Sequence, residues 1–301
     1  MNVDSYWRNL QRDHEHSMAE ASGPGPVDQK LNLILAGVCI LTALVLLAVG
    51  GYRVGFDAVR DIGRHLPTVF LEILSKFGET SAAICLIALI ARRHPRAVWM
   101  GVVASVYATA LTHALKGVCD TARPAAVLGK WVTVIGPVLK LHSFPSGHTM
   151  TAFLLAACIS VGAPINTRLL LYALAAAVGL SRVWIGAHWP IDVIAGAGIA
   201  GLSVALSIST MRLTDWVPGL IAHLAVVSLI AVCAVWELMI VPEYPLARLL
   251  SVVIAACSLS VLARDYVFRI TWCGVRTADR VPCETPERPR YAWARRPEPD
   301  E

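Results

Sequence analysis

The stretch Leu31–Tyr52 reads LNLILAGVCILTALVLLAVGGY and contains no charged residue. An α-helix rises about 1.5 Å per residue, so about 20 apolar residues in succession cross the hydrocarbon core of a bilayer. A run of this length without a charge is typical of a transmembrane helix. The stretch therefore predicts a membrane-spanning helix, and it decides the fold class expected for the rest of the chain.

Seven further apolar runs follow the first one. The composition agrees with them, because 56% of the 301 residues are hydrophobic and only 16% are charged, against about 25% charged residues in a soluble domain. We expect an all-α, polytopic membrane helix bundle. A purely soluble enzyme, a disordered chain, a disulfide-stapled secreted domain and a nucleic-acid binder are excluded. The seven runs cover residues 66–91, 97–118, 149–163, 169–186, 191–211, 217–241 and 246–263.

Charged segments flank the apolar part of the chain at both ends. Residues 1–30 are too long and too acidic for the charged end of a signal peptide, so we expect a retained cytoplasmic tail. Residues 264–301 are rich in Arg, Glu, Asp and Pro, and proline prevents any long helix, so we expect a disordered tail. The last two apolar runs, within residues 212–263, form a distinct C-terminal helix pair.

Basic residues in short loops predict the orientation of the bundle. By alternation of the eight spans, the most arginine-rich loops fall on the same side as the N-terminus, and basic loops stay in the cytoplasm. We therefore expect a bacterial inner-membrane protein with both termini in the cytoplasm. Segments 119–148 and 187–191 then face the periplasm. The arginines that support this orientation are Arg92, Arg93, Arg96, Arg168 and Arg212. The charge bias is incomplete, since Arg53, Arg60 and Arg64 lie on the other side.

The two outward segments and the helix ends beside them contain a group of residues suited to binding phosphate. Lys116, Arg123 and Arg182 supply three cations, and the two guanidinium groups are planar forks that match phosphate oxygens. Ser146 and Gly147 stand where the N-cap of the next helix is expected. Exposed N–H groups and the helix dipole favour an anion at such a position. A phosphate is therefore the expected ligand.

Two histidines in this anion site suggest two chemical roles. His188 precedes Asp192 by four residues, and a carboxylate there can hold one ring nitrogen protonated and aim the other outward. This arrangement activates a nucleophile. His148 can donate a proton to the leaving oxygen as a general acid. The segments contain too few carboxylates for a two-metal phosphatase, so we expect no metal and no other cofactor.

These residues resemble the three signature motifs of the type 2 phosphatidic acid phosphatase superfamily, which includes the vanadium haloperoxidases and glucose-6-phosphatase. The resemblance implies a six-helix core, here about residues 31–211, and a phosphohistidine mechanism. It implies that His188 attacks phosphorus, that His148 protonates the leaving group and that Lys116, Arg123, Ser146 and Arg182 hold the phosphoryl oxygens. The chain satisfies every fixed motif position in order, at Lys116, Arg123, Pro124, Pro145, Ser146, Gly147, His148, Ser181, Arg182, His188 and Asp192.

Three functions are compatible with these motifs. The leading hypothesis is an integral membrane phosphatase that removes a terminal phosphate from a lipid phosphate or diphosphate. A phosphotransferase that passes the phosphoryl group from a polyprenyl diphosphate to another lipid would use the same site. A transporter or scaffold could keep the motifs without catalysis, but all fixed residues are present. We expect the partners to be the lipid substrate and the bilayer, with no nucleic acid and no obligate protein partner. The particular lipid stays open.

Charged residues elsewhere in the apolar runs have simpler interpretations. Glu72, Lys76 and Glu79 are spaced three and four residues apart, so we expect an ion-pair ladder on one helical face at the membrane interface. His223 and Glu237 lie near opposite ends of one run. We expect both side chains to snorkel toward the membrane surface.

Overall fold

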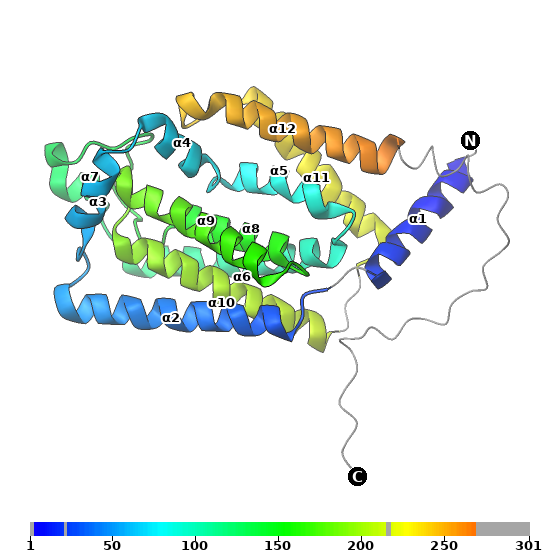
Figure 1. Cartoon of the computed structure of the whole chain (residues 1–301), viewed down its shortest axis with the longest axis horizontal. Coiled ribbons are helices and arrows are strands. Elements are labelled where there is room, and N and C mark those ends of the chain that lie inside the picture. The colour runs from blue at the N-terminus through cyan, green and yellow to red at the C-terminus, as the bar shows by residue number, and fades with distance from the viewer. Residues whose placement is uncertain (1–2, 21–22, 215–217, 269–301) are drawn as a thin grey trace, which may run out of the picture.

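The computed structural model describes residues 3–20, 23–214 and 218–268, and within these ranges it contains helices and no strand (Figure 1). The predicted all-α membrane bundle is confirmed. A disordered tail was expected over residues 264–301, and this is wrong for residues 264–268, which are helical, while residues 269–301 lie outside the described residues. The helices are α1 Val3–Glu20, α2 Pro26–Gly50, α3 Phe56–Arg64, α4 Thr68–Lys76, α5 Thr80–Ala91, α6 Pro95–Cys119, α7 Pro124–Leu128, η1 Gly129–Trp131, α8 Gly147–Ser160, α9 Ile165–Trp184, α10 Pro190–Leu213, α11 Leu220–Met239, η2 Pro245–Ala247, α12 Arg248–Leu262 and the π-helical η3 Ala263–Phe268.

The described helices make the chain a multi-pass membrane protein. Five of them are long and apolar enough to cross a bilayer, or six if the bent pair α4 and α5 is one span. A helix lies at each of the eight predicted places. The 14-residue α8 is shorter than a full span, however, and α9 does not reach the apolar character of the others. The prediction that these two also span the bilayer therefore stays a prediction.

The predicted single helix over residues 66–91 is wrong, because the chain breaks between α4 and α5 and bends by 63°. Gly78 lies in the break, where an added Cβ would stand 2.9 Å from the Cβ of His148. This close approach leaves no room for a side chain. The break therefore brings the chain against the first turn of α8.

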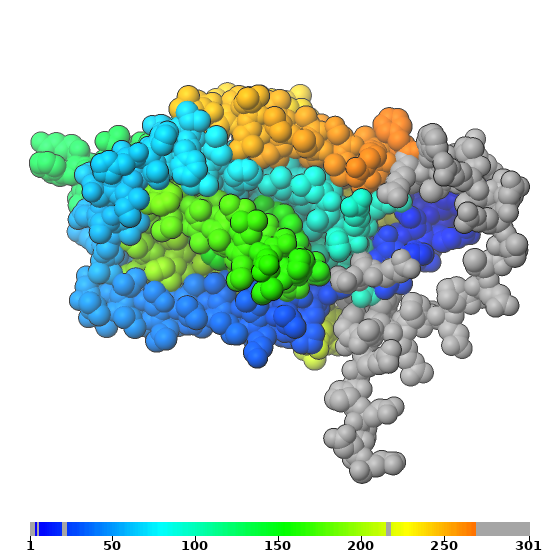
Figure 2. All heavy atoms as spheres, in the orientation of Figure 1, coloured from blue at the N-terminus to red at the C-terminus, as the bar shows by residue number. Residues whose placement is uncertain are grey.

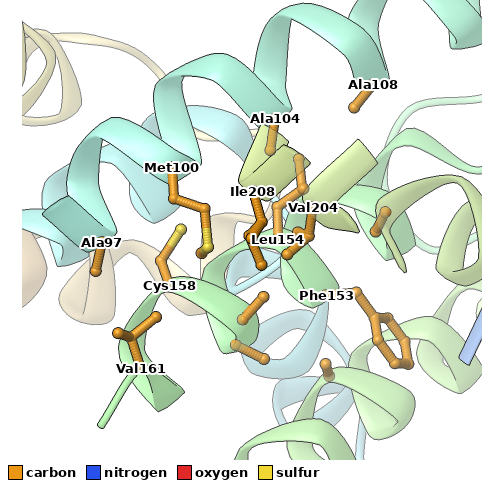
Figure 3. Packing of buried hydrophobic residues seen from close by; sticks show 14 of the residues in the cluster. Ala97, Met100, Ala104, Ala108, Phe153, Leu154, Cys158, Val161, Val204 and Ile208 are labelled. Carbon is orange, nitrogen blue, oxygen red and sulfur yellow. The ribbon is translucent and has the colours of Figure 1, made fainter. Parts of the chain in front are cut away.

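Small residues allow the central helix α10 to approach its neighbours closely. A Cβ at Gly201 would lie 2.7 Å from the carbonyl oxygen of Asn32 on α2, and one at Gly196 would lie 2.5 Å from that of Ser146. Close backbone contact of this kind is the usual basis of helix association in a membrane. On its other side α10 packs Val204 and Ile208 against α6 and α8 (Figure 3). The packed core therefore supports the start of α8.

The basic loops gather at one end of the bundle together with the N-terminal segment. Ion pairs join Arg168 to Asp28 and Arg92 to Asp13 on α1, and Arg212 donates to Gln29 over 3.1 Å. The predicted clustering of these loops on one side is thus confirmed. Residues 3–20 of the expected tail form the helix α1. Whether this end faces the cytoplasm stays a prediction.

The C-terminal pair α11 and α12 packs against α5 and covers the edge of the bundle opposite α2 (Figure 2). Two expectations about charged residues are wrong here. His223 and Glu237 do not snorkel, since their side chains are buried inside the bundle. Glu237 instead forms an ion pair with the buried Lys76, with 2.8 Å between Nζ and Oε2. Lys76 also pairs with Glu79, but Glu72 accepts a hydrogen bond from the backbone of Leu246, so the predicted ladder is incomplete.

Candidate active site

The third motif runs from the last turn of α9 through the short connection to the first turn of α10. Pro190 is the first residue of α10, and Asp192 lies in its first turn. Oδ2 of Asp192 accepts a hydrogen bond from the backbone N–H of Trp189 over 2.9 Å, which caps the helix. The same oxygen lies 3.2 Å from Nδ1 of His188. Capping and histidine orientation therefore depend on one carboxylate.

The contacts of His188 assign its tautomer. Its Nε2 lies 3.2 Å from Nη1 of Arg123, and a guanidinium can only donate hydrogen bonds. Nε2 must therefore present its lone pair, while Nδ1 carries the proton and donates it to Asp192. Burial lowers the pKa of His188 to about 4, with the charge of Arg123 adding to this and Asp192 opposing it. The ring is thus neutral near pH 7, with the nitrogen that could attack phosphorus unprotonated.

Asp192 is fully buried and has more partners than the sequence suggested. Its Oδ2 also accepts from the hydroxyl of Ser143 over 2.5 Å, and its Oδ1 accepts from the hydroxyl of Tyr52. Burial, and then the charge of Asp192, raises the pKa of Tyr52, so the phenol keeps its proton and donates it. The carboxylate is therefore held as an anion by four donors.

Arg123 connects the first motif to the third and to the loop that precedes the second. Its Nε donates to the carbonyl of Leu141 over 3.0 Å, and its Nη1 donates to the carbonyl of Ala187 over 3.2 Å. Its backbone N–H donates to the carbonyl of Lys140 over 2.8 Å. Burial, followed by the nearby charge of Arg182, lowers the pKa of Arg123. A buried cation beside a second cation is a favourable position for an anion.

The second motif forms the beginning of α8. Ser146 is its N-cap, with the hydroxyl accepting from Thr149, and Gly147 is the first helical residue, as predicted. The backbone N–H of Ser146 donates to the carbonyl of Asp192 over 3.0 Å, which joins this motif to the third. A Cβ at Gly147 would meet open space. On the following residue, Nε2 of His148 is buried without a hydrogen-bond partner among the described residues.

Arg182 lies on the last turn of α9, and its backbone carbonyl accepts from the N–H groups of Ala187 and His188. Its Nη1 donates to the hydroxyl of Tyr244 over 2.6 Å. Its Nε is buried and has no partner among the described residues. Lys116, on the last turn of α6, is half-buried and within electrostatic reach of Arg123 and Asp192. All eight predicted site residues therefore gather at the end of the bundle opposite the arginine-rich loops.

Three contacts of the site were missed by the sequence analysis. Ser143 lies two residues before the second motif, so its place in the loop was a weak signal. Tyr52 ends the first apolar run, Tyr244 lies between the last two, and neither belongs to any of the three motifs. No group of three or more histidine, cysteine, aspartate or glutamate side chains within residues 3–20, 23–214 and 218–268 is arranged to hold a metal ion. Metal independence itself stays a prediction.

The fold and the site together define a polytopic helical membrane protein in which buried arginine and histidine side chains gather at one end of the bundle. Residues 96–216, which include every predicted site residue, match the model of the PAP2 superfamily. The resemblance to this superfamily found from the motifs is thus confirmed over the segment that holds all three motifs.

Curated relatives match parts of the chain as well. The chain is 45% identical over 62 residues to "Bacitracin transport permease protein BcrC" of Bacillus licheniformis, a match to 21% of this chain and 30% of that protein. It is 29% identical over 166 residues to "Lipid A 1-phosphatase" of Rhizobium etli, covering 48% of this chain and 68% of that protein. The crystal structure of Aquifex aeolicus LpxE is similar over 51% of this chain and 93% of that one, with 28% identity and a TM-score of 0.47.

Proposed function

We propose that the protein is an integral membrane phosphatase that hydrolyses the terminal phosphate of a lipid phosphate or diphosphate through a phosphohistidine intermediate. The observation that carries this proposal is the position of Nε2 of His188, which is unprotonated and presents its lone pair to a buried guanidinium nitrogen 3.2 Å away. A nucleophile and a phosphate-binding group are thus adjacent. The match of residues 96–216 to the PAP2 superfamily and the similarity to a lipid A 1-phosphatase support the same reaction class.

The first half of the reaction forms a phosphorus–nitrogen bond. Nε2 of His188 attacks phosphorus while the bond from phosphorus to the leaving oxygen breaks, and His148 gives that oxygen its proton. Asp192 stabilises the positive charge that develops on the His188 ring, because its carboxylate accepts the Nδ1 proton. The phosphoryl oxygens are held by Lys116, Arg123, Arg182, the hydroxyl of Ser146 and the backbone N–H of Gly147.

The second half returns the enzyme to its starting state. Water attacks the phosphorus of phosphohistidine, the phosphorus–nitrogen bond breaks, and His148 takes back a proton from the water. Inorganic phosphate leaves, and His188 is again neutral. A transferase would replace this water with the hydroxyl of a second lipid.

The lipid reaches the site from within the bilayer. The site lies at one end of a bundle whose helices are long enough to span a membrane, so a phosphate can enter while its apolar chains stay in lipid. We propose that this end faces the periplasm of a bacterial inner membrane and that both termini are cytoplasmic. The arginines at the opposite end support this orientation.

The experiment is release of inorganic phosphate by the purified full-length protein in detergent, with a panel of phosphatidate, phosphatidylglycerophosphate, undecaprenyl diphosphate and lipid A. We expect release from at least one lipid without any second lipid present. His188→Ala should abolish release, and brief quenching of the wild type should trap an acid-labile phosphoenzyme. His113→Ala is the matched control, since His113 is an exposed histidine on α6. Release that needs a second lipid would identify a transferase.

A transporter is the competing interpretation with an observation in its favour, because the name of the Bacillus relative describes a transport permease. The same panel separates the two. A transporter releases no phosphate from any lipid, whether or not His188 is present. His148→Ala gives a further test, because it should slow lipids more than an aryl phosphate, whose leaving oxygen needs less protonation.

A further inference from the structure

We propose that Tyr244, on the loop between α11 and α12, positions the Arg182 guanidinium for phosphate and thereby makes the C-terminal helix pair part of the active site. The proposal rests on the proposed function, because it assigns Arg182 to phosphate binding. Tyr244 lies outside residues 96–216, the segment that matches the PAP2 superfamily. It contributes to the site from a part of the chain that the motifs do not include.

The hydrogen bond between the two residues determines which edge of the guanidinium is left for a ligand. Nη1 of Arg182 donates to the Tyr244 hydroxyl over 2.6 Å, and Cζ of the guanidinium lies 5.8 Å from the centre of the tyrosine ring. The remaining edge carries Nε and Nη2, whose N–H bonds are parallel and match two oxygens of a phosphate. Nε is buried and has no partner among the described residues. A phosphate at this edge would supply the missing acceptor.

Tyr244 contacts the proposed proton donor as well. Its ring centre lies 6.5 Å from that of His148, and the two planes are nearly perpendicular, at 89°. One buried ring therefore contacts a phosphate-binding arginine and the histidine that would protonate the leaving oxygen. A shift of the ring would alter both positions, which is why its placement matters for catalysis.

Contacts around the loop keep Tyr244 in place. The backbone N–H of Leu246 donates to Oε2 of Glu72 over 2.8 Å, which joins the loop to α4. The guanidinium of Arg248 donates to the carbonyls of Glu237, Leu238 and Ile240 at the end of α11. Such contacts reduce the freedom of the loop and the entropy lost when a ligand binds.

The loop from residue 119 to 148 closes over the other side of the ring. Gly136 has a φ of +89°, and a Cβ there would lie 2.6 Å from Cε1 of Tyr244. Only glycine combines this backbone conformation with such an approach. The ring is therefore enclosed between the C-terminal pair and the loop that holds the second motif, and Tyr244 is fully buried.

The test is the affinity of the purified full-length protein for orthovanadate, measured by calorimetry in detergent. Tyr244→Phe keeps the ring and removes the hydroxyl, and we expect the Kd for vanadate to rise about tenfold, as for loss of a hydrogen bond to a charged group. Tyr172→Phe is the matched control. Tyr172 is on the same helix as Arg182, and its hydroxyl donates to Asn32 on α2 over 3.1 Å. Removing this hydroxyl should leave the Kd for vanadate unchanged.

A double-mutant cycle separates positioning from direct contact. In an Arg182→Ala background, Tyr244→Phe should change the Kd by less than about twofold, because the hydroxyl acts through the guanidinium. An equal loss in both backgrounds would mean that the hydroxyl binds the anion itself, which overturns the proposal. An unchanged Kd in the single variant overturns it too. If Tyr244→Phe does not fold, Glu72→Ala, which frees the loop at Leu246, should weaken vanadate binding about threefold.

The outcome is separable from that of the proposed function. If the wild type binds vanadate and shows the expected coupling but releases phosphate from no lipid, the proposed function fails and the positioning role stands. If the wild type hydrolyses a lipid and the cycle shows no coupling, the positioning role alone fails. With an active lipid, Tyr244→Phe should also raise KM more than it lowers kcat.

Discussion

Asp192 holds the ring of His188 from one turn away, with 3.2 Å between Oδ2 and Nδ1. The carboxylate cannot rotate freely, because Oδ2 also accepts from the Ser143 hydroxyl and from the backbone of Trp189. The histidine is therefore oriented by a group that is itself fixed by the start of α10. Such fixed orientation is what a nucleophile needs in order to attack without first reorganising.

Replacing Asp192 by asparagine should lower kcat about 10³-fold. The amide can donate to Nδ1 of His188, which would move the ring proton to Nε2 and remove the attacking lone pair. Phosphate release from the preferred lipid gives kcat. Ser143→Ala serves as the comparison, since it removes one donor to the carboxylate and leaves the tautomer unchanged. A decrease of less than tenfold in Asp192→Asn would show that the tautomer does not limit the reaction.

The low pKa of His188 predicts activity that persists in mild acid. With a pKa of about 4, about nine tenths of the ring is neutral at pH 5, whereas an ordinary histidine would be about 3% neutral there. The acid limb of kcat/KM should therefore lie near pH 4. The same low pKa that preserves activity in mild acid lowers the free energy of unfolding there. The unfolded chain binds a proton at His188 below about pH 6.5 and the folded chain does not until pH 4, so stability falls as pH falls through this window.

Arg123→Lys should lower kcat/KM about 10²-fold although the charge is kept. The guanidinium donates from Nε to Leu141 and from Nη1 toward His188, and an ammonium cannot reach both directions at once. Vanadate inhibition should weaken in parallel. Arg168→Lys is the control, because Arg168 also donates from Nε and Nη1 but lies at the start of α9, far from the site at the end of that helix. Equal losses in the two variants would indicate damage to the fold rather than to the site.

The buried pair of Lys76 and Glu237 should matter for stability. Lys76→Met leaves Glu79 and Glu237 without their cation, and breaking a buried ion pair costs about 3 kcal/mol or more. We expect a clear fall in the midpoint of thermal unfolding in detergent. Lys76→Met combined with Glu237→Leu should recover most of it, because no unpaired carboxylate then remains at position 237. A single variant as stable as the wild type would show that the ion pair contributes little.

The parts of this molecule that were predictable from sequence are the local ones. The spacing of His188 and Asp192 lies within one turn at a helix start, and Ser146 caps the helix that follows it, so a short window holds all the information. The pair of Lys76 and Glu237 joins residues 161 positions apart. From the sequence, Lys76 was expected in a ladder with its near neighbours Glu72 and Glu79, and Glu237 was expected to snorkel. Tyr244 has no motif around it for the same reason: its role depends on where α11 and α12 pack. The break at Gly78 was missed because hydropathy does not detect a backbone contact with α8.

The orientation of the bundle gives the last prediction. Cys119 is the last residue of α6, and Arg93 lies just before the first residue of that helix; both side chains are exposed. A helix of this length is about 37 Å long. The two positions should therefore lie on opposite sides of the membrane. In a variant without the other seven cysteines, an impermeant thiol reagent added to intact cells should label Cys119. In a second variant, which lacks Cys119 too and has a single cysteine at position 93, the reagent should react only after the cells are opened. A cysteine in place of the exposed Lys130 repeats the outer test. Labelling of position 93 alone in intact cells would reverse the orientation, place the site at the cytoplasmic surface and leave the chemistry unchanged.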